Sequence, residues 1–272
     1  MIGTALCRKL KKHDLIVPPS FKMNIGNEKQ VMSFIKYQPN LIIHLAGETD
    51  HEYAEINPVN CYYINTVATG FLTNLARELN VPIIYQSTAS VFDGAKNEPY
   101  TPEDRPNPIN HYNRSKYYGE LMVRDYDKHI ILRSGWMFGG GPGIDKKFVA
   151  KIIEKIRRGD KQISVCTDCV GSPTYTEDLA GAYEYVINNL IDKDFGTYHC
   201  VNKSVRGVSR FEFAQELVRL LGSEVEIVPC KIDELKDEFP TPRTNYEVLA
   251  EGIGMPDWAD SLKEYVNAYY RP

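Results

Sequence analysis

The chain has 272 residues, of which 43% are hydrophobic and 25% are charged, and its formal net charge is −4. This composition is typical of a globular protein and excludes a disordered or collagen-like chain. No apolar run approaches the roughly 20 residues that span a bilayer, and no basic stripe is visible. Neither a membrane nor a nucleic acid is therefore expected as a partner.

Strand-like and helix-like segments alternate along the chain. Short β-branched runs predict strands at 41–45, 81–85, 129–132 and 224–228. Apolar residues three or four apart predict helices at 28–37, 60–79, 112–126, 146–158, 176–189, 210–221 and 257–269. This alternation predicts an α/β fold, with a Rossmann-type doubly wound parallel sheet and helices on both faces.

After Gly171 the pattern changes to helices with isolated strands, which predicts a smaller second lobe and a ligand site in the cleft beside it. Six cysteines are scattered along the chain, and only Cys166 and Cys169 form a CxxC. No second ligand pair follows at zinc-site spacing, so we expect two free thiols near a strand end and no metal. No signal peptide is recognised, and a reducing cytoplasm is the expected compartment.

Tyr112 and Lys116 form a YxxxK at the start of a predicted helix. A spacing of four places both side chains on one face, where the ammonium could lower the pKa of the phenol. Taken alone, the pair is equally consistent with a solvated helix face. The hydroxyls of Ser87, Thr88 and Ser90 follow the strand predicted at 81–85, at the carboxyl end where open α/β sheets hold ligands. An ordinary serine/threonine turn is the alternative.

Ala46 and Gly47 follow the strand predicted at 41–45. Such small residues let a flat ring or a pyrophosphate approach the backbone closely, although tight packing on a helix explains them equally well. Trp136 follows the strand predicted at 129–132 and could be either a ligand contact or a core aromatic.

Six ordered segments together resemble the extended short-chain dehydrogenase/reductase superfamily, and within it the dTDP-4-dehydrorhamnose reductase family. They are HLAGETD (44–50), STASVFDG (87–94), the YxxxK (112–116), LRSGWMFG (132–139), GSPTYTEDLA (171–180) and GTYHCVN (196–202). The resemblance covers essentially the whole chain. It implies that residues 1–170 are the NAD(P)-binding domain and that residues 171–272 are mainly the substrate lobe, with some segments returning to the first domain.

The resemblance also implies the reaction and the residues that perform it. A hydride passes from the nicotinamide to the C4 ketone of a nucleotide-linked 6-deoxysugar, as in deoxysugar and cell-surface polysaccharide biosynthesis. Tyr112 gives its proton to the forming alkoxide, Thr88 binds the same oxygen, and Lys116 lowers the pKa of Tyr112 and holds the nicotinamide ribose. Trp136 takes the place of a substrate-side tryptophan. The implied cofactor positions are Ile2, Gly3, Asn24, Ile25, Ala46, Gly47, Glu48 and Thr49, together with Tyr112 and Lys116.

The amino-terminal segment departs from the family pattern. A first strand followed by GxxGxxG should receive the pyrophosphate, but here Gly3 matches only the last glycine. The missing strand would lie at the centre of the sheet, and its absence would leave neighbouring ladders open. We therefore expect the natural chain to begin upstream of Met1, and we expect dinucleotide binding to be weak if Met1 is the authentic start.

Two further departures concern the substrate and the cofactor. Ala89 and Ser90 stand where reductases of this kind usually carry Asp-Tyr, which argues against a dehydratase because neither can act as an acid or base. A strand expected near 14–17 is followed by no acidic residue that could hold a ribose hydroxyl. Lys22 is a candidate for a 2′-phosphate contact, so NADPH is marginally favoured over NADH.

Two alternatives share the fold. One is a non-catalytic regulatory subunit similar to the β subunit of methionine adenosyltransferase, and the other is a nucleotide-sugar epimerase. The intact Thr88, Tyr112 and Lys116 favour the reductase. Three cations, Arg206, Arg210 and Arg243, could pair with a nucleotide diphosphate, or could only be solvated. A homodimer is left open.

Overall fold

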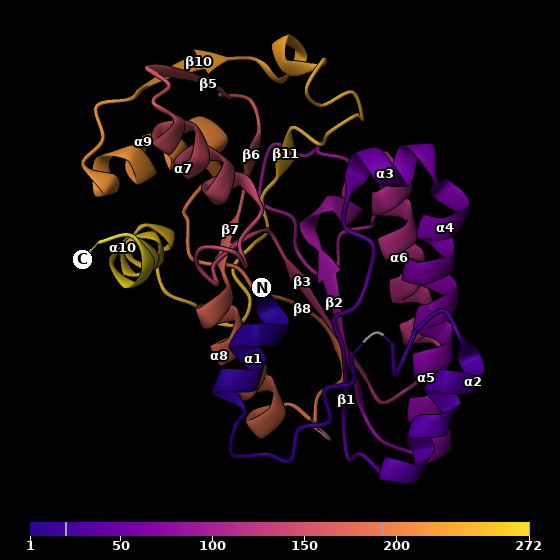
Figure 1. Cartoon of the computed structure of the whole chain (residues 1–272). Helices are drawn as coiled ribbons and strands as arrows, with labels where there is room; N and C mark the ends of the chain where they lie inside the picture. Colours follow the sequence, from indigo (N-terminus) through magenta and orange to yellow (C-terminus); the bar gives the residue numbers. More distant parts are fainter. Residues whose placement is uncertain (20, 192, 272) are drawn as a thin grey trace.

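The central sheet is parallel and has helices on both faces. The computed structural model describes residues 1–19, 21–191 and 193–271 of the chain (Figure 1). Its largest sheet has the strand order β1-β2-β3-β8, and every pair is parallel. The strands are β1 (Ile42–His44), β2 (Ile83–Thr88), β3 (His129–Ser134) and β8 (Gly196–His199). The predicted α/β class is confirmed.

Successive side chains of the central strands supply two different hydrophobic cores. Ile84 and Ile130 belong to the core with α1 (Ile2–Lys9) and α8 (Thr176–Asn189). On the other face, Ile83 belongs to the core with three helices, α2 (Glu28–Met32), α5 (Ala68–Leu79) and α6 (His111–Arg124). Neighbouring residues of a strand point to opposite faces, so both helical layers of Figure 1 are anchored by the same apolar runs.

A third core lies beside one end of the sheet. It is built by α7 (Phe148–Arg158), α9 (Arg210–Leu221) and α10 (Trp258–Tyr269) against β5 (Gln162–Cys166) and β10 (Glu226–Cys230), which pair in parallel. Short strands join this lobe to the rest. They are β4 (Trp136–Phe138) with β7 (Pro173–Tyr175), and β6 (Val170–Gly171) with β9 (Val208–Ser209) and β11 (Tyr246–Glu247).

Most predicted elements are present with small shifts in their ends. The helix predicted at 60–79 is α4 (Pro58–Tyr62), a π-helical turn (Tyr63–Val67) and α5 in succession. The helix predicted at 28–37 is α2 followed by a 3₁₀ turn (Ser33–Tyr37). Additional short helices are α3 (His51–Ile56) and 3₁₀ turns at Ala89–Val91 and Ile232–Leu235. In the described residues, no helix is both long and apolar enough to cross a membrane.

The strand expected at 14–17 is wrong, because these residues have no regular secondary structure. A strand is held by ladder hydrogen bonds, and within the described residues β1 pairs only with β2. The apolar side chains of this segment are therefore solvated, with Val17 65% exposed. β-branched composition predicts a strand only where a partner edge is available.

Candidate active site

Thr88 is the last residue of β2, and its side chain begins the turn that follows. The backbone N–H of Ser90 donates to Thr88 Oγ1 at 3.2 Å, and Thr88 Oγ1 donates to Ser90 Oγ at 3.3 Å. This serine/threonine turn fixes the direction of the Thr88 hydroxyl at the carboxyl edge of the sheet. The predicted placement at a strand end is confirmed, while the role of Thr88 stays a prediction.

Tyr112 lies in the first turn of α6. The Asn110 side chain caps this helix by accepting the Asn113 N–H at 2.8 Å. Tyr112 is only 8% exposed, and the His51 ring lies 4.3 Å from its own ring, centroid to centroid. Burial raises the pKa of Tyr112 above 10, and a hydrogen bond with Thr88 offsets only part of the rise. The phenol is therefore protonated at neutral pH, as a proton donor must be.

Lys116 follows one turn later, and its ammonium lies against β2. Lys116 Nζ donates to the Gln86 carbonyl at 2.7 Å and lies 4.1 Å from the centroid of the Tyr85 ring. Burial lowers the pKa of Lys116 from 10.5 to about 7, although the charge of Glu120 opposes this. Desolvation of the phenol dominates its pKa, and Lys116 points to Gln86, so the expected lowering of the Tyr112 pKa by Lys116 stays a prediction.

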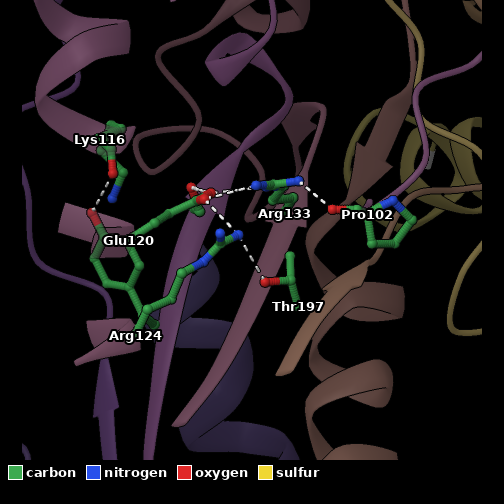
Figure 2. A network of polar contacts seen from close by, with 8 residues as sticks. Pro102, Lys116, Glu120, Arg124, Arg133 and Thr197 are labelled. Atoms are coloured by element: carbon green, nitrogen blue, oxygen red, sulfur yellow. Dashed lines mark hydrogen bonds and ion pairs between the residues drawn. The ribbon is translucent and has the colours of Figure 1, made fainter. Parts of the chain in front are cut away.

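A buried ion pair fixes the same helix one further turn along (Figure 2). Arg133 on β3 donates to both oxygens of Glu120, at 2.8 and 2.7 Å, and neither side chain is exposed. Ser87 Oγ donates to Glu120 Oε1 at 2.6 Å, and Arg124 adds a longer contact of 3.4 Å. Paired geometry of this kind compensates the cost of burying two charges. These contacts attach helix α6 to β2 and β3. They thereby fix the position of Tyr112 and Lys116 relative to the ends of these strands.

The predicted cofactor residues after β1 are held by Asn65, which the sequence analysis did not identify. Asn65 Oδ1 accepts the Glu48 N–H at 2.8 Å, and Asn65 Nδ2 donates to the Glu48 carbonyl at 3.0 Å. A Cβ on Gly47 would lie 2.9 Å from Asn65 Oδ1, so only glycine permits this clamp. Ala46, Gly47 and Thr49 remain exposed, and this stretch of backbone is open to a ligand.

The remaining cofactor positions lie around this stretch. Gly3, in the first turn of α1, has the Leu45 side chain 3.7 Å from the position of an added Cβ, so α1 begins beside the end of β1. Ile2 is buried in the core with α8. Asn24 and Ile25 lie in a turn before α2, where the Asn24 side chain accepts the N–H of Gly26 at 3.0 Å. Their roles stay predictions.

Trp136 lies on β4, one of the short strands that join the second lobe to the rest. A Cβ on Gly171 would lie 2.7 Å from the Trp136 ring, which therefore packs directly on the backbone of β6. The Arg210 guanidinium lies 3.6 Å from the ring centroid of Trp136, and Trp136 Nε1 donates to Glu247 Oε1 at 2.8 Å. Trp136 is half-buried and polar-bonded rather than a plain core aromatic.

The three arginine candidates lie in different surroundings. Arg210 lies on Trp136, whereas Arg243 forms an ion pair with Glu52 of α3. The Arg206 side chain is 84% exposed and contacts Glu212 at 3.3 Å. Only Arg210 and Arg243 thus belong to the surroundings of Tyr112; both also lower the pKa of His51, which burial brings to about 3.

The CxxC forms a compact cluster at the end of β5. One ligand atom each from Cys166, Asp168 and Cys169 lies within 4.8 Å of the others, and all six cysteines are free thiols. Two surface hollows have volumes of about 610 and 530 Å³. Neither is lined by Thr88, Tyr112 or Lys116, so both lie outside the candidate active site.

Sequence comparisons agree with the fold and with the motif order. The profile of the RmlD substrate-binding domain family matches residues 1–271. The spore coat polysaccharide biosynthesis protein SpsK of Bacillus subtilis is 30% identical, over 97% of this chain and 93% of its own length. A dTDP-4-dehydrorhamnose reductase of Mycolicibacterium smegmatis is 31% identical, over 98% of this chain and 83% of its own length.

Solved structures give the same result. A dTDP-4-dehydrorhamnose reductase from Clostridium acetobutylicum has a TM-score of 0.88 at 32% identity and covers 98% of this chain and 95% of its own. The enzyme from Bacillus anthracis, solved in complex with NADP, has a TM-score of 0.89 at 28% identity with the same coverage. The resemblance seen in the motifs is therefore confirmed, and the chain belongs to the RmlD substrate-binding domain family.

Proposed function

We propose that this protein is an NADPH-dependent oxidoreductase that reduces the C4 ketone of a nucleotide-linked 4-keto-6-deoxysugar, as dTDP-4-dehydrorhamnose reductase does. The observation that carries the proposal is a buried, protonated Tyr112 beside Thr88 at the carboxyl edge of the sheet, with Trp136 linked to the same turn through Glu247. Family membership and the NADP complex of a relative support it.

The chain's own residues supply the proton and the orientation. Bound NADPH supplies the hydride. Tyr112 gives its proton to the oxygen of the ketone. Thr88 donates a hydrogen bond to the same oxygen, for which its hydroxyl must turn away from Ser90 Oγ. General acid catalysis of this kind contributes about 10² to 10⁴ in rate. Lys116 holds the nicotinamide ribose, for which its ammonium must leave the Gln86 carbonyl or share it.

The residues present fit a dinucleotide at the end of β1. Gly47 leaves the backbone open where Asn65 clamps it, and Gly3 brings the start of α1 beside Leu45. We propose that Ala46, Gly47, Glu48 and Thr49 lie along the cofactor, with Ile2 and Gly3 at its pyrophosphate. Asn24 and Ile25 would contact the adenine.

The division into a dinucleotide-binding part (1–170) and a mainly sugar-binding part (171–272) stays a prediction. So does a dTDP sugar as the substrate, together with a role in dTDP-rhamnose and polysaccharide biosynthesis in the cytoplasm. A homodimer is likewise a prediction, which the mass in solution would test.

The deciding experiment follows nicotinamide absorbance with a panel of 4-keto-6-deoxy nucleotide sugars. One NADPH consumed per sugar reduced supports the proposal, and faster turnover with NADPH than with NADH supports the cofactor. An epimerase would return the cofactor unchanged, and a regulatory subunit would bind without turnover. Either result would exclude the reductase.

A further inference from the structure

Glu247 lies between the two sides of the proposed active site, although it is far from both in sequence. Its Oε2 accepts a hydrogen bond from Ser90 Oγ at 2.6 Å, and its Oε1 accepts one from Trp136 Nε1 at 2.8 Å. Ser90 in turn receives the hydroxyl of Thr88 at 3.3 Å. The carboxylate on β11 is therefore two hydrogen bonds away from the proposed catalytic hydroxyl.

Glu247 forms no direct ion pair in the part of the chain that the structure describes, although burial lowers the pKa of the nearby Arg210 and the charge of Glu247 opposes this. Among the ion pairs of the described residues none includes Glu247, since Arg210 stacks on the Trp136 ring and Arg243 pairs with Glu52. Glu247 is half-buried. An ionised carboxylate has about four acceptor sites, and two are used here, one on each oxygen. The remaining acceptor capacity can take a donor from a ligand.

The neighbours restrict what that donor can be. Glu247 lies beside the turn that follows β2, where Ser90 donates its hydroxyl to the carboxylate. Besides burial, the charge of Glu247 raises the pKa of Tyr112, so the carboxylate and the proposed proton donor belong to the same site. On a 4-keto-6-deoxysugar, C3 on one side of the ketone carries a hydroxyl, which is a hydrogen-bond donor, and C5 on the other side carries the methyl group.

We infer that Glu247 is a specificity-determining residue that accepts a hydrogen bond from the ring hydroxyl adjacent to the reacting ketone. This inference rests on the proposed function. A hydrogen bond to a charged acceptor is stronger than a neutral one. The enzyme should thus discriminate against a sugar that lacks this hydroxyl, and the discrimination should disappear with the carboxylate.

The test crosses two sugars with three proteins. The sugars are the dTDP-linked 4-keto-6-deoxysugar and its 3-deoxy analogue, and the proteins are the wild type, Glu247→Gln and Glu247→Ala. We expect the wild type to favour the hydroxylated sugar about 10- to 100-fold in kcat/KM. Glu247→Ala should lose this preference by slowing on the hydroxylated sugar alone, and Glu247→Gln should fall between them.

The controls separate the possible failures. Glu251→Gln changes an exposed carboxylate of the same segment and should keep the wild-type preference. Equal losses on both sugars in the Glu247 variants would indicate a merely structural role and overturn the inference, as would a wild type that reduces both sugars equally well. In both cases the proposed function survives. A wild type that binds NADPH but reduces neither sugar would overturn the proposed function, and the inference with it.

Discussion

Two buried cations lie on or against helix α6, and only one of them has a charged partner. Arg133 is completely enclosed and has a bidentate carboxylate partner in Glu120. Lys116 lies on α6, one turn before Glu120, and is 7% exposed. Its ammonium contacts a neutral carbonyl and the face of a ring. The Arg133 charge is thus matched, whereas the Lys116 charge is largely uncompensated and its pKa falls to about 7.

The difference shows that some side chains on or against α6 serve stability and others serve function. A matched pair holds α6 in register on β2 and β3, and its removal should cost folding rather than chemistry. An unmatched buried amine one helical turn from the Tyr112 phenol costs folding energy while it is present, which is typical of active-site residues. Substitution of Glu120 should therefore mainly change the unfolding free energy, whereas substitution of Tyr112 should mainly change turnover.

The largest effect is expected at Tyr112. Tyr112→Phe removes the proposed proton donor while keeping the ring against His51, so turnover should fall at least ~10²-fold. Because the phenol is protonated and carries no charge to lose, the unfolding midpoint and NADPH affinity should stay near wild type. Steady-state kinetics measures the turnover, urea denaturation the unfolding midpoint, and a fluorescence titration the NADPH affinity. A variant with near wild-type turnover would exclude Tyr112 as the acid.

Glu120→Ala should produce the opposite pattern. It leaves the Arg133 guanidinium buried without its carboxylate, which typically costs about 3–5 kcal/mol of unfolding free energy. Urea denaturation measures this loss. The double variant Glu120→Leu with Arg133→Met removes both charges and should recover most of the stability. If the double variant were no more stable than Glu120→Ala, the loss would come from packing rather than from the stranded cation.

Lys116→Met should lose activity and yet gain stability in a pH-dependent way. The unfolded lysine has a pKa near 10.5 and the folded one about 7, so between these values the unfolded chain binds more protons. Wild-type stability from this group therefore rises with pH across that window. The variant's advantage should be about 2–4 kcal/mol at pH 6, and it should shrink toward pH 10. A pH-independent difference would mean that Lys116 is not a buried charge.

Local signals in the sequence account well for the helices and for part of the site. Helix α9 was predicted at its observed ends, because its apolar spacing is clear and Ser209 and Glu212 form a capping box at its start. The YxxxK spacing correctly placed Tyr112 and Lys116 on one face of α6. These features depend on residues within one or two turns of each other.

The missed features are those that depend on distant partners. Glu247 and Ser90 are 157 positions apart, and no pattern in the chain connects them. The burial that raises the pKa of Tyr112 was missed for a similar reason, since spacing reveals a neighbouring lysine but not the desolvation of the phenol. Asn65 reads only as a polar residue within a helix until the backbone of Glu48 is placed beside it.

The smallest effect is expected at Arg206, which extends the comparison to an exposed charge. Its ion pair with Glu212 lies at the surface, where solvent screens the attraction and side-chain ordering opposes it. Arg206→Ala should change the unfolding free energy by less than about 0.5 kcal/mol and leave the KM for the sugar nucleotide unchanged. Arg210→Ala is the matched control and should raise that KM, because it removes the cation stacked on Trp136. A raised KM in Arg206→Ala would instead place a substrate phosphate at this surface and enlarge the site beyond Arg210.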